Sequence, residues 1–225
     1  MLTKEIFDRL AGIFGLAVFF PVLLLTGIAI AIAMPGAPAL FRQKRVGRNG
    51  KLFTLVKFRT MTPSHGGSSV SVAGESRITS LGAVLRRWKI DELPELWNVV
   101  KGDMSFVGPR PDVPGYADCL TGDDRRILAL KPGITGPATL RYRYEEELLA
   151  LQADPQIYND NVIYPDKVRV NLAYLDSRSF GLDMRIIIST LISSLQSRLL
   201  PSDFRTIIPE DHRSTTTQSV NIYAS

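Results

Sequence analysis

LAGIFGLAVFFPVLLLTGIAIAIAMPGAPALF (residues 10–41) is the stretch that decides the fold, and it contains no charged side chain. A transmembrane helix needs about 20 consecutive apolar residues, so this segment is long enough to enter a bilayer. A buried core helix rarely reaches this length. A cleaved signal peptide has a shorter apolar region and would not carry Glu5 and Asp8 before it. The segment therefore predicts a membrane helix.

Pro21 divides the strongest apolar part into residues 10–20 and 22–34, and two topologies follow. In the first, one helix kinked at the proline spans the membrane. In the second, each half is only about 17–20 Å long, so the segment enters the bilayer and returns as a re-entrant hairpin. Basic residues flank both ends, as expected if both ends lie in the cytoplasm. The residues alone leave both topologies open.

Charge is unevenly distributed along the 225 residues, which carry a net charge of +5. Residues 9–74 contain eight basic residues and no acidic one, so the rest of the chain carries −3. The basic surface therefore directly follows the apolar segment. A hydrophobic share of 45% excludes disorder of the whole chain.

Cysteine and histidine are too few for the chemistry that they usually supply. Cys119 is the single cysteine, which excludes a disulfide framework within the chain. His65, His212 and Cys119 share no zinc-ligand spacing. Any chemistry must therefore rest on carboxylates, Lys and Arg, or hydroxyls.

The remaining sequence predicts a mostly α-helical domain with one small β-hairpin. Residues 40–46 and 51–58 flank a Gly/Asn turn and predict the hairpin. A short amphipathic helix is expected over 80–89, capped by Thr79 or Ser80. A second helix is expected to begin at Asp91–Glu92, with Pro94 tolerated in its first turn.

Less regular segments alternate with further helices in the second half. Gly- and Ser-rich residues 62–76 predict a loop, and residues 102–115 predict an irregular stretch. Additional helices are expected near 116–131, 144–152, 166–177 and 183–198. The last of these is very apolar and is either a core helix or, with its neighbour, an interfacial helix at the bilayer surface. The chain thus divides into a membrane segment (1–40), a catalytic domain (41–198) and a polar tail (199–225).

The adjacent carboxylates Asp91 and Glu92 are the main candidates for chemistry. Such a pair at a helix start is usually a cap that interacts well with the helix dipole. Paired carboxylates also suit Mg²⁺, which prefers oxygen ligands and keeps substrate phosphates in its shell. An ionised Asp can attack phosphorus and form a covalent intermediate.

Many cations are available to bind a diphosphate, although most Arg and Lys residues of a protein are simply solvated. Arg forks match phosphate oxygens well. Arg110 lies between Pro109 and Pro111, so a stiff loop presents its side chain. The turn KPGITG (131–136) is interpreted as a rigid structural element or a ligand wall. The candidate substrate-binding residues are Lys57, Arg59, Arg86, Arg110, Arg141 and Arg143.

The order of these motifs resembles the bacterial sugar transferase family, the small monotopic phosphoglycosyl transferases. Asp-Glu-Leu-Pro followed by Gly-Asp-Met-Ser-Phe-Val-Gly-Pro-Arg-Pro is its most specific part. The resemblance covers roughly residues 1–195. The matching residues are FRQKRVGRNGKLFTLVKFRTM (41–61), ITSLGAVLRRWKIDELPELWNVVKGDMSFVGPRPD (78–112), KPGITG (131–136) and SFGLDMRIIISTL (179–191).

The resemblance implies transfer of a sugar-1-phosphate from a UDP-sugar to undecaprenyl phosphate, with UMP as the second product. It implies Mg²⁺ as cofactor and Asp91 as both nucleophile and metal ligand, with Glu92 supporting it by handling the acceptor's proton. Lys57, Arg86 and Arg110 match positions expected near the phosphates. It also implies a monotopic protein with a Pro-broken re-entrant helix on the cytoplasmic face of the bacterial inner membrane. Its partners are then membrane lipids and the two substrates, without nucleic acid, and a homodimer stays open.

This sequence departs from many family members in one region. Where they continue the Pro-Gly-Ile-Thr-Gly element with Trp-Ala-Gln, this chain has residues 137–143 (PATLRYR). The acidic run Glu145–Glu147 and the insertion up to Pro165 also differ from the shortest members. In the family this region lies near the sugar-nucleotide end, so the sugar is not identified by the resemblance.

Two other hypotheses explain part of the same sequence. One is a single-span membrane anchor with a basic domain that binds nucleic acid or a partner protein, suggested by the Arg42–Arg59 cluster. It gives no reason for Asp91–Glu92 or for Arg110 between two prolines. The other is a transferase that forms a ternary complex and no covalent intermediate.

Overall fold

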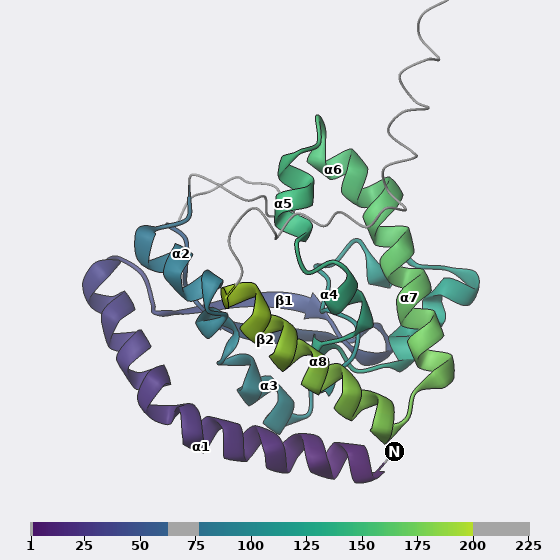
Figure 1. Cartoon of the computed structure of the whole chain (residues 1–225), viewed down its shortest axis with the longest axis horizontal. Coiled ribbons are helices and arrows are strands. Elements are labelled where there is room, and N and C mark those ends of the chain that lie inside the picture. Colours follow the sequence, from purple (N-terminus) through teal and green to yellow (C-terminus); the bar gives the residue numbers. More distant parts are fainter. Residues whose placement is uncertain (1, 63–76, 200–225) are drawn as a thin grey trace, which may run out of the picture.

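The computed structural model describes residues 2–62 and 77–199 and shows a mainly helical body with a long β-hairpin (Figure 1). This confirms the prediction of a mostly helical domain with one β-hairpin. Apart from Thr62 and Leu199, the loop predicted for 62–76 and the tail predicted for 199–225 lie outside the described residues.

Helix α1 (Leu2–Ala33) runs along one edge of the body and continues through Pro21 without interruption. Figure 1 shows that the helix is bent, so that its C-terminal part turns away from the direction of its N-terminal part. Proline kinks a helix because it removes a donor and its ring clashes with the preceding turn. The break expected at Pro21 is therefore a bend in one continuous helix. This helix is long and apolar enough to cross a membrane.

Both ends of α1 pack against the rest of the protein. Near its start, Gly12 and Gly15 allow close approach to α3 (Glu95–Lys101), because a Cβ on either would lie 3.0–3.2 Å from a side chain of that helix. Near its end, Ile30 and Met34 are buried against Phe58. The outward face stays exposed along the whole length. Leu10, Phe14, Leu25 and Ile32 are 63–77% exposed on it.

Polar contacts fix the start of α1 to the domain. The Ser105 hydroxyl donates a hydrogen bond to the buried Asp8 carboxylate at 2.8 Å. Lys4 pairs with Asp183 at 2.6 Å, and Glu5 lies 3.8 Å from Arg48 at the tip of the hairpin. The membrane segment predicted for residues 1–40 thus packs against the domain predicted for 41–198 through one face of α1.

The hairpin formed by β1 (Leu40–Val46) and β2 (Leu52–Phe58) confirms the predicted pairing and turn. Its register places Phe41 opposite Lys57 and Arg45 opposite Phe53. Opposite residues of an antiparallel pair share a face, and residues two apart along a strand do too. Lys57, Leu55, Phe53 and Arg45 therefore share one face. Phe53 and Leu55 pack there against Val99 and Met104.

The segment between the hairpin and α3 differs slightly from the prediction. Helix α2 (Ser80–Arg87) has Thr79 as its N-cap, and the Thr79 hydroxyl accepts a hydrogen bond from the Gly82 amide at 3.0 Å. The next helix does not begin at Asp91–Glu92. Residues Ile90–Glu92 form a 3₁₀ turn, and α3 starts at Glu95 after Pro94 at its N-cap position. Pro94 has no amide hydrogen to donate, so the turn and α3 remain separate elements.

A second, parallel strand pair was not predicted. Strand β3 (Ser105–Val107) lies in the stretch expected to be irregular, and β4 (Gly133–Thr135) lies in the predicted turn 131–136. The backbones cross without side chains between them. A Cβ at Gly133 would overlap the amide nitrogen of Gly108, and one at Gly136 would overlap the Gly108 carbonyl. These glycines therefore allow the two motif segments to touch.

We expect Gly133→Ala to lower the free energy of unfolding by about 3 kcal/mol or more, because the added methyl group has no space between two backbones. Gly181→Ala is the matched control, since a Cβ there meets no atom within 4 Å. Thermal unfolding in detergent measures both. Equal melting temperatures for the two variants would show that the crossing is not as tight as described.

Residues 116–199 are mainly helical, with one correction to the prediction. Residues 116–131 form two 3₁₀ segments rather than an α-helix, Ala117–Cys119 and Gly122–Ala129. The other predicted helices are confirmed within a few residues. They are α5 (Glu145–Ala150), α7 (Tyr164–Ser177) and α8 (Phe180–Leu199). The structure adds three segments that were not predicted, α4 (Pro137–Arg141), α6 (Pro155–Tyr158) and a π-helical turn (Asn159–Ile163).

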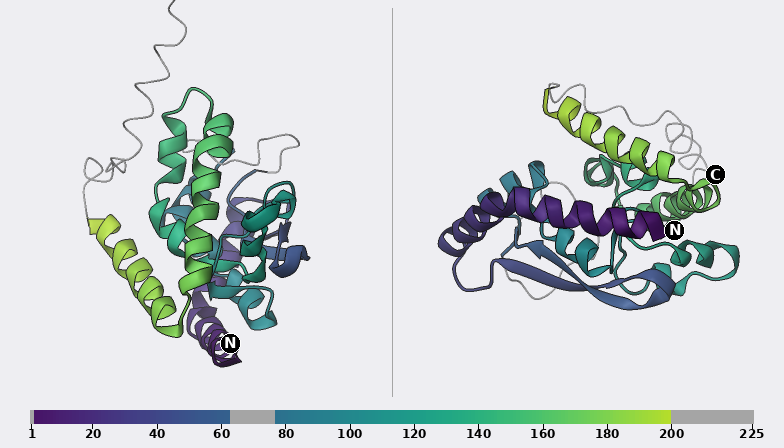
Figure 2. Two further views of the ribbon diagram at one scale, coloured as in Figure 1. Left: turned by 90° about the vertical axis from the view of Figure 1, so that its right-hand side faces the viewer. Right: turned by 90° about the horizontal axis from the view of Figure 1, so that it is seen from below.

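Helix α8 is a core helix on one face and is exposed on the other. Ile186 is buried against Tyr174 and Val107, so one face belongs to the core. Ile188, Leu191 and Ile192 are 51–66% exposed on the other. Phe180 at its start packs edge-to-face on Phe7 of α1, with ring centroids 5.3 Å apart. Figure 2 shows the rest of α8 running along the outside of the body.

Candidate active site

Asp91 lies in the 3₁₀ turn between α2 and α3, and it is buried, with 6% of its surface exposed. Its Oδ1 atom is also buried and has no hydrogen-bond partner among the described residues. Burial raises the pKa of the Asp91 carboxyl, and the neighbouring charge of Glu92 raises it further, against the opposing effects of Lys57, Lys89 and Arg86. A buried carboxylate oxygen without a partner is costly for the fold and is available for a ligand.

Glu92 is held by two cations at the same place. Its Oε1 accepts hydrogen bonds from Lys57 Nζ at 3.1 Å and from Arg110 at 2.6 Å. Burial alone would raise the pKa of Glu92, but the charges of Arg110, Lys57 and Lys89 outweigh it and hold that pKa well below its usual value. Glu92 in turn raises the pKa of Arg110. Glu92 therefore stays ionised and binds Lys57 and Arg110 at the position next to Asp91 in the chain.

Lys57 also pairs with a third carboxylate, Glu95, at 3.0 Å. Glu95 is 2% exposed, and burial raises its pKa. The sequence analysis missed this residue. The spacing of the carboxylates could have revealed it, because residues three and four apart lie on one face of a helix. Glu95 follows Glu92 by three positions and Asp91 by four.

Two side chains fix the elements that carry these groups. Asn98 of α3 accepts a hydrogen bond from the Val56 amide at 3.1 Å and donates to the Thr54 carbonyl at 2.8 Å, which ties α3 to the strand bearing Lys57. Arg45 of β1 donates to the Pro111 carbonyl at 3.0 Å, which ties the hairpin to the Arg110 loop. Neither side chain was singled out from the sequence.

The structure brings together only part of the predicted substrate-binding set. Lys57 and Arg110 meet at Glu92, as described above. Arg86 forms an ion pair with Glu146 of α5, and its charge still lowers the pKa of Asp91. Arg59 is buried and donates to the Met34 carbonyl just beyond the end of α1. That contact holds α1 against the hairpin.

The remaining two predicted cations belong to the α4–α7 region. Arg141 pairs with Asp166 of α7 at 2.7 Å. Arg143 lies over the Tyr144 ring, with 5.9 Å from its guanidinium carbon to the ring centroid. These contacts place both residues in the region where the sequence departs from the family pattern.

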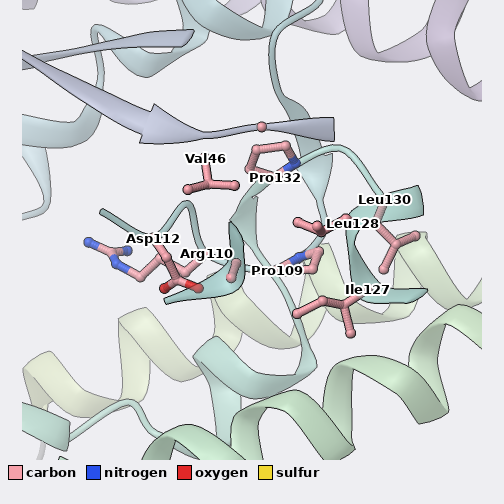
Figure 3. Close-up of a pocket in the computed structure, with 10 residues that line it drawn as sticks. Val46, Pro109, Arg110, Asp112, Ile127, Leu128, Leu130 and Pro132 are labelled. Atoms are coloured by element: carbon pink, nitrogen blue, oxygen red, sulfur yellow. The ribbon is translucent and has the colours of Figure 1, made fainter. Parts of the chain in front are cut away.

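A small cavity lies under the Arg110 loop (Figure 3). Its volume is about 20 Å³, which suits a single water rather than a nucleotide, since ligand sites usually measure about 300–1,000 Å³. Val46, Leu128 and Pro132 line it together with Asp112, whose pKa burial raises to about 6. We regard this cavity as part of the support of the Arg110 loop.

The carboxylates around Asp91 can be compared with what Mg²⁺, the cofactor implied by the resemblance, requires. The described residues contain no group of three or more His, Cys, Asp or Glu side chains arranged for a metal. Mg²⁺ usually needs only one or two carboxylates, with water and substrate phosphates completing its shell. The unpartnered Oδ1 of Asp91 fits that requirement, whereas Glu92 is already neutralised by two cations.

Asp91 offers a buried carboxylate oxygen, the cations bound to Glu92 offer positive charge for an anionic substrate, and α1 presents an exposed apolar face. Comparison with known proteins makes this specific. Residues 1–197 match the model of the bacterial sugar transferase family, and the chain belongs to that family.

Several curated proteins are similar over most of this chain. The sugar transferase EpsL of Bacillus subtilis is 37% identical over 197 residues, covering 88% of this chain and 89% of EpsL. A UDP-glucose:undecaprenyl-phosphate glucose-1-phosphate transferase of Caulobacter vibrioides is 36% identical, covering 86% of this chain and 70% of that protein. A UDP-N-acetylgalactosamine-undecaprenyl-phosphate N-acetylgalactosaminephosphotransferase of Aeromonas hydrophila is 34% identical, covering 84% of this chain and 42% of that protein. The last two are named for different sugars, so similarity does not identify the sugar.

Proposed function

We propose that this protein transfers a sugar-1-phosphate from a UDP-sugar to undecaprenyl phosphate, yielding undecaprenyl-diphosphate-sugar and UMP. This would be the first membrane step of surface polysaccharide assembly. The observation that carries the proposal is the buried, unpartnered Oδ1 of Asp91, next in sequence to Glu92, which binds Lys57 and Arg110. Family membership and the names of the relatives support the substrate classes.

The reaction is proposed to occur in two displacements at phosphorus. An Asp91 oxygen attacks the phosphorus that bears the sugar, and the bond to the UMP oxygen breaks, so UMP leaves with the bonding electrons. The ionised phosphate of the lipid then attacks the same phosphorus, and the bond to Asp91 breaks. The carboxylate is regenerated, and no net proton transfer to the protein is required.

The side chains around Asp91 have separate roles in this scheme. Lys57 and Arg110 stabilise the charge on the transferring phosphoryl group, because fixed cations lower the energy of such a transition state. Glu92 is proposed to hold these two cations. A carboxylate that two cations keep ionised is a weak base, so this role replaces the proton transfer implied by the family resemblance. Mg²⁺ would be held by Asp91 and would neutralise phosphate charge when bound.

A re-entrant position of α1 is proposed for the membrane topology. A straight helix of 32 residues would be about 48 Å long and would carry one end away from the domain. Here the bend allows both ends to contact it, through Asp8 and Lys4 at the start and Ile30 and Met34 at the end. The exposed apolar face between them supports a shallow position in the bilayer. The domain would then lie on the cytoplasmic face of the inner membrane, at the height of the lipid phosphate.

Thiol labelling tests this topology. With Cys119→Ser as background, Thr3→Cys and Arg48→Cys place thiols at the start of α1 and at the hairpin tip. A re-entrant α1 predicts that an impermeant maleimide reaches neither thiol in intact spheroplasts and reaches both after permeabilisation. Labelling of the Thr3→Cys protein alone in intact spheroplasts would instead show a spanning helix.

The pH dependence of the first displacement should follow Asp91. The nucleophile must be ionised, and burial raises its pKa, so activity is lost as pH falls through a value above the usual ~3.9 of Asp. UMP release without lipid acceptor should be measured, because the lipid phosphate itself titrates near pH 6. A rate independent of pH down to about 4 would contradict the assignment of Asp91.

A panel of UDP-sugars, assayed for UMP release in nanodiscs containing undecaprenyl phosphate, tests the function as a whole. At least one sugar should give UMP and a lipid-linked product. Absence of UMP with every sugar, together with salt-sensitive binding of DNA or RNA, would favour the nucleic-acid alternative.

A further inference from the structure

Lys89 stands out beside Asp91 because of its backbone. It immediately precedes the 3₁₀ turn and has φ 55° and ψ 24°, in the left-handed region. Among the described residues, only Lys89 and Asn49 have positive φ without being glycine. This conformation costs a residue with a Cβ about 1–2 kcal/mol. Asn tolerates it far better than Lys does, so local preference does not explain a lysine here.

Lys89 differs from the neighbouring cations because no carboxylate of the described residues pairs with it. Lys57 and Arg110 are both bound to Glu92, and Arg86 is bound to Glu146. The exposed Lys89 side chain makes no hydrogen bond or ion pair with the part of the chain that the structure describes. Its charge nevertheless acts on the site, since it lowers the pKa of both Asp91 and Glu92.

The charges at the site indicate what such a cation could bind. Before any substrate arrives, Lys57 and Arg110 already face the carboxyl groups of Glu92 and Glu95, with Asp91 adjacent to Glu92. The diphosphate of a nucleotide sugar adds further negative charge, which in the transition state is spread over the oxygens of the transferring phosphoryl group. A cation without an ion-pair partner, two residues from the proposed nucleophile, is placed to neutralise this added negative charge.

We propose that the Lys89 ammonium group binds the phosphate oxygens of the nucleotide sugar next to Asp91, and that the left-handed backbone at Lys89 directs the side chain there. The proposal rests on the proposed function and adds a substrate-binding residue to it. Glu92 already neutralises part of the positive charge of Lys57 and Arg110. Lys89 thereby supplies an additional positive charge for the substrate.

Three variants separate the charge of Lys89 from its backbone. Lys89→Asn removes the charge and tolerates the left-handed conformation, while Lys89→Arg keeps the charge. Arg87→Gln is the control, because it removes another exposed cation from the same segment. We expect Lys89→Asn to lower kcat/KM for UMP release about 10- to 100-fold, the usual range for a charged hydrogen bond. Lys89→Arg should stay within about 3-fold of the wild type, and Arg87→Gln should be unchanged.

One further measurement distinguishes phosphate binding from a structural role. Binding of UDP, measured by calorimetry in an Asp91→Asn background, should weaken by a similar factor.

The outcomes separate this inference from the proposed function. If the wild type releases UMP and Lys89→Asn matches Arg87→Gln in kcat/KM and UDP binding, the inference is overturned and the function stands. If no UDP-sugar yields UMP, the proposed function fails. In that case the affinity for UDP alone tests the role of Lys89, and equal affinities of the wild type and Lys89→Asn would overturn the inference.

Discussion

Asp91→Asn should abolish turnover, with kcat/KM for UMP release reduced at least about 10,000-fold. The amide of Asn has no anionic oxygen to form a bond with phosphorus, yet it has nearly the shape of the carboxylate. Oδ1 has no hydrogen-bond partner within residues 2–62 and 77–199, so the change breaks no contact of that oxygen there. The melting temperature should therefore stay equal to that of the wild type or rise, because a buried charge disappears.

Asp123→Asn is the matched control, since that carboxylate is 72% exposed on the surface. It should leave UMP release and the melting temperature unchanged. Wild-type UMP release by the Asp91→Asn protein would refute the assignment of the nucleophile. An Asp91→Asn protein that is inactive and strongly destabilised would instead show a structural role.

Glu92→Gln should have the second largest effect, with kcat/KM lowered roughly 100-fold. The substitution removes the anion that Lys57 and Arg110 share, so Arg110 loses its carboxylate partner and Lys57 keeps only Glu95. The free energy of unfolding should fall by about 2 kcal/mol. This is less than for a fully buried pair, because the Arg110 side chain is 44% exposed.

The half-reactions distinguish this role of Glu92 from that of a base for the acceptor. Loss of a positioning residue slows UMP release even without lipid, whereas loss of such a base leaves that step at the wild-type rate. Glu147→Gln removes an exposed carboxylate and should change neither step. Wild-type UMP release without lipid by Glu92→Gln would restore the proton-transfer role to Glu92.

Local signals explain which elements were predictable. The hairpin around residues 47–50 combines alternating strands with a turn sequence, and both signals act over a few residues. Thr79 as a cap and the apolar period of α2 are similarly local. The position of Asp91 and Glu92 between two helices followed from the same patterns, although α3 begins at Glu95, four residues later than expected.

Contacts between distant residues could not be read from the sequence. The pairing of β3 with β4 joins segments almost thirty residues apart, and only their close backbone approach explains Gly108, Gly133 and Gly136. The partners of the candidate cations depend on the same long-range packing. That packing places Lys57 and Arg110 on Glu92 and Arg59 on the end of α1. A list of basic residues near a motif does not show which of them lie at the candidate active site and which hold α1 in place.

The central claim is that Asp91 carries the sugar phosphate between the two substrates. Trypsin should cut after Lys89 and Lys101, so residues 90–101 form a peptide whose only Asp is Asp91. Intact-mass and peptide analysis of the wild type, incubated with its UDP-sugar and no lipid acceptor, is the most direct measurement. We predict that the protein gains one sugar-phosphate, located on this peptide, and loses it when undecaprenyl phosphate is added. Full turnover with lipid, but an unchanged protein mass without it, would contradict the covalent mechanism and favour a ternary complex.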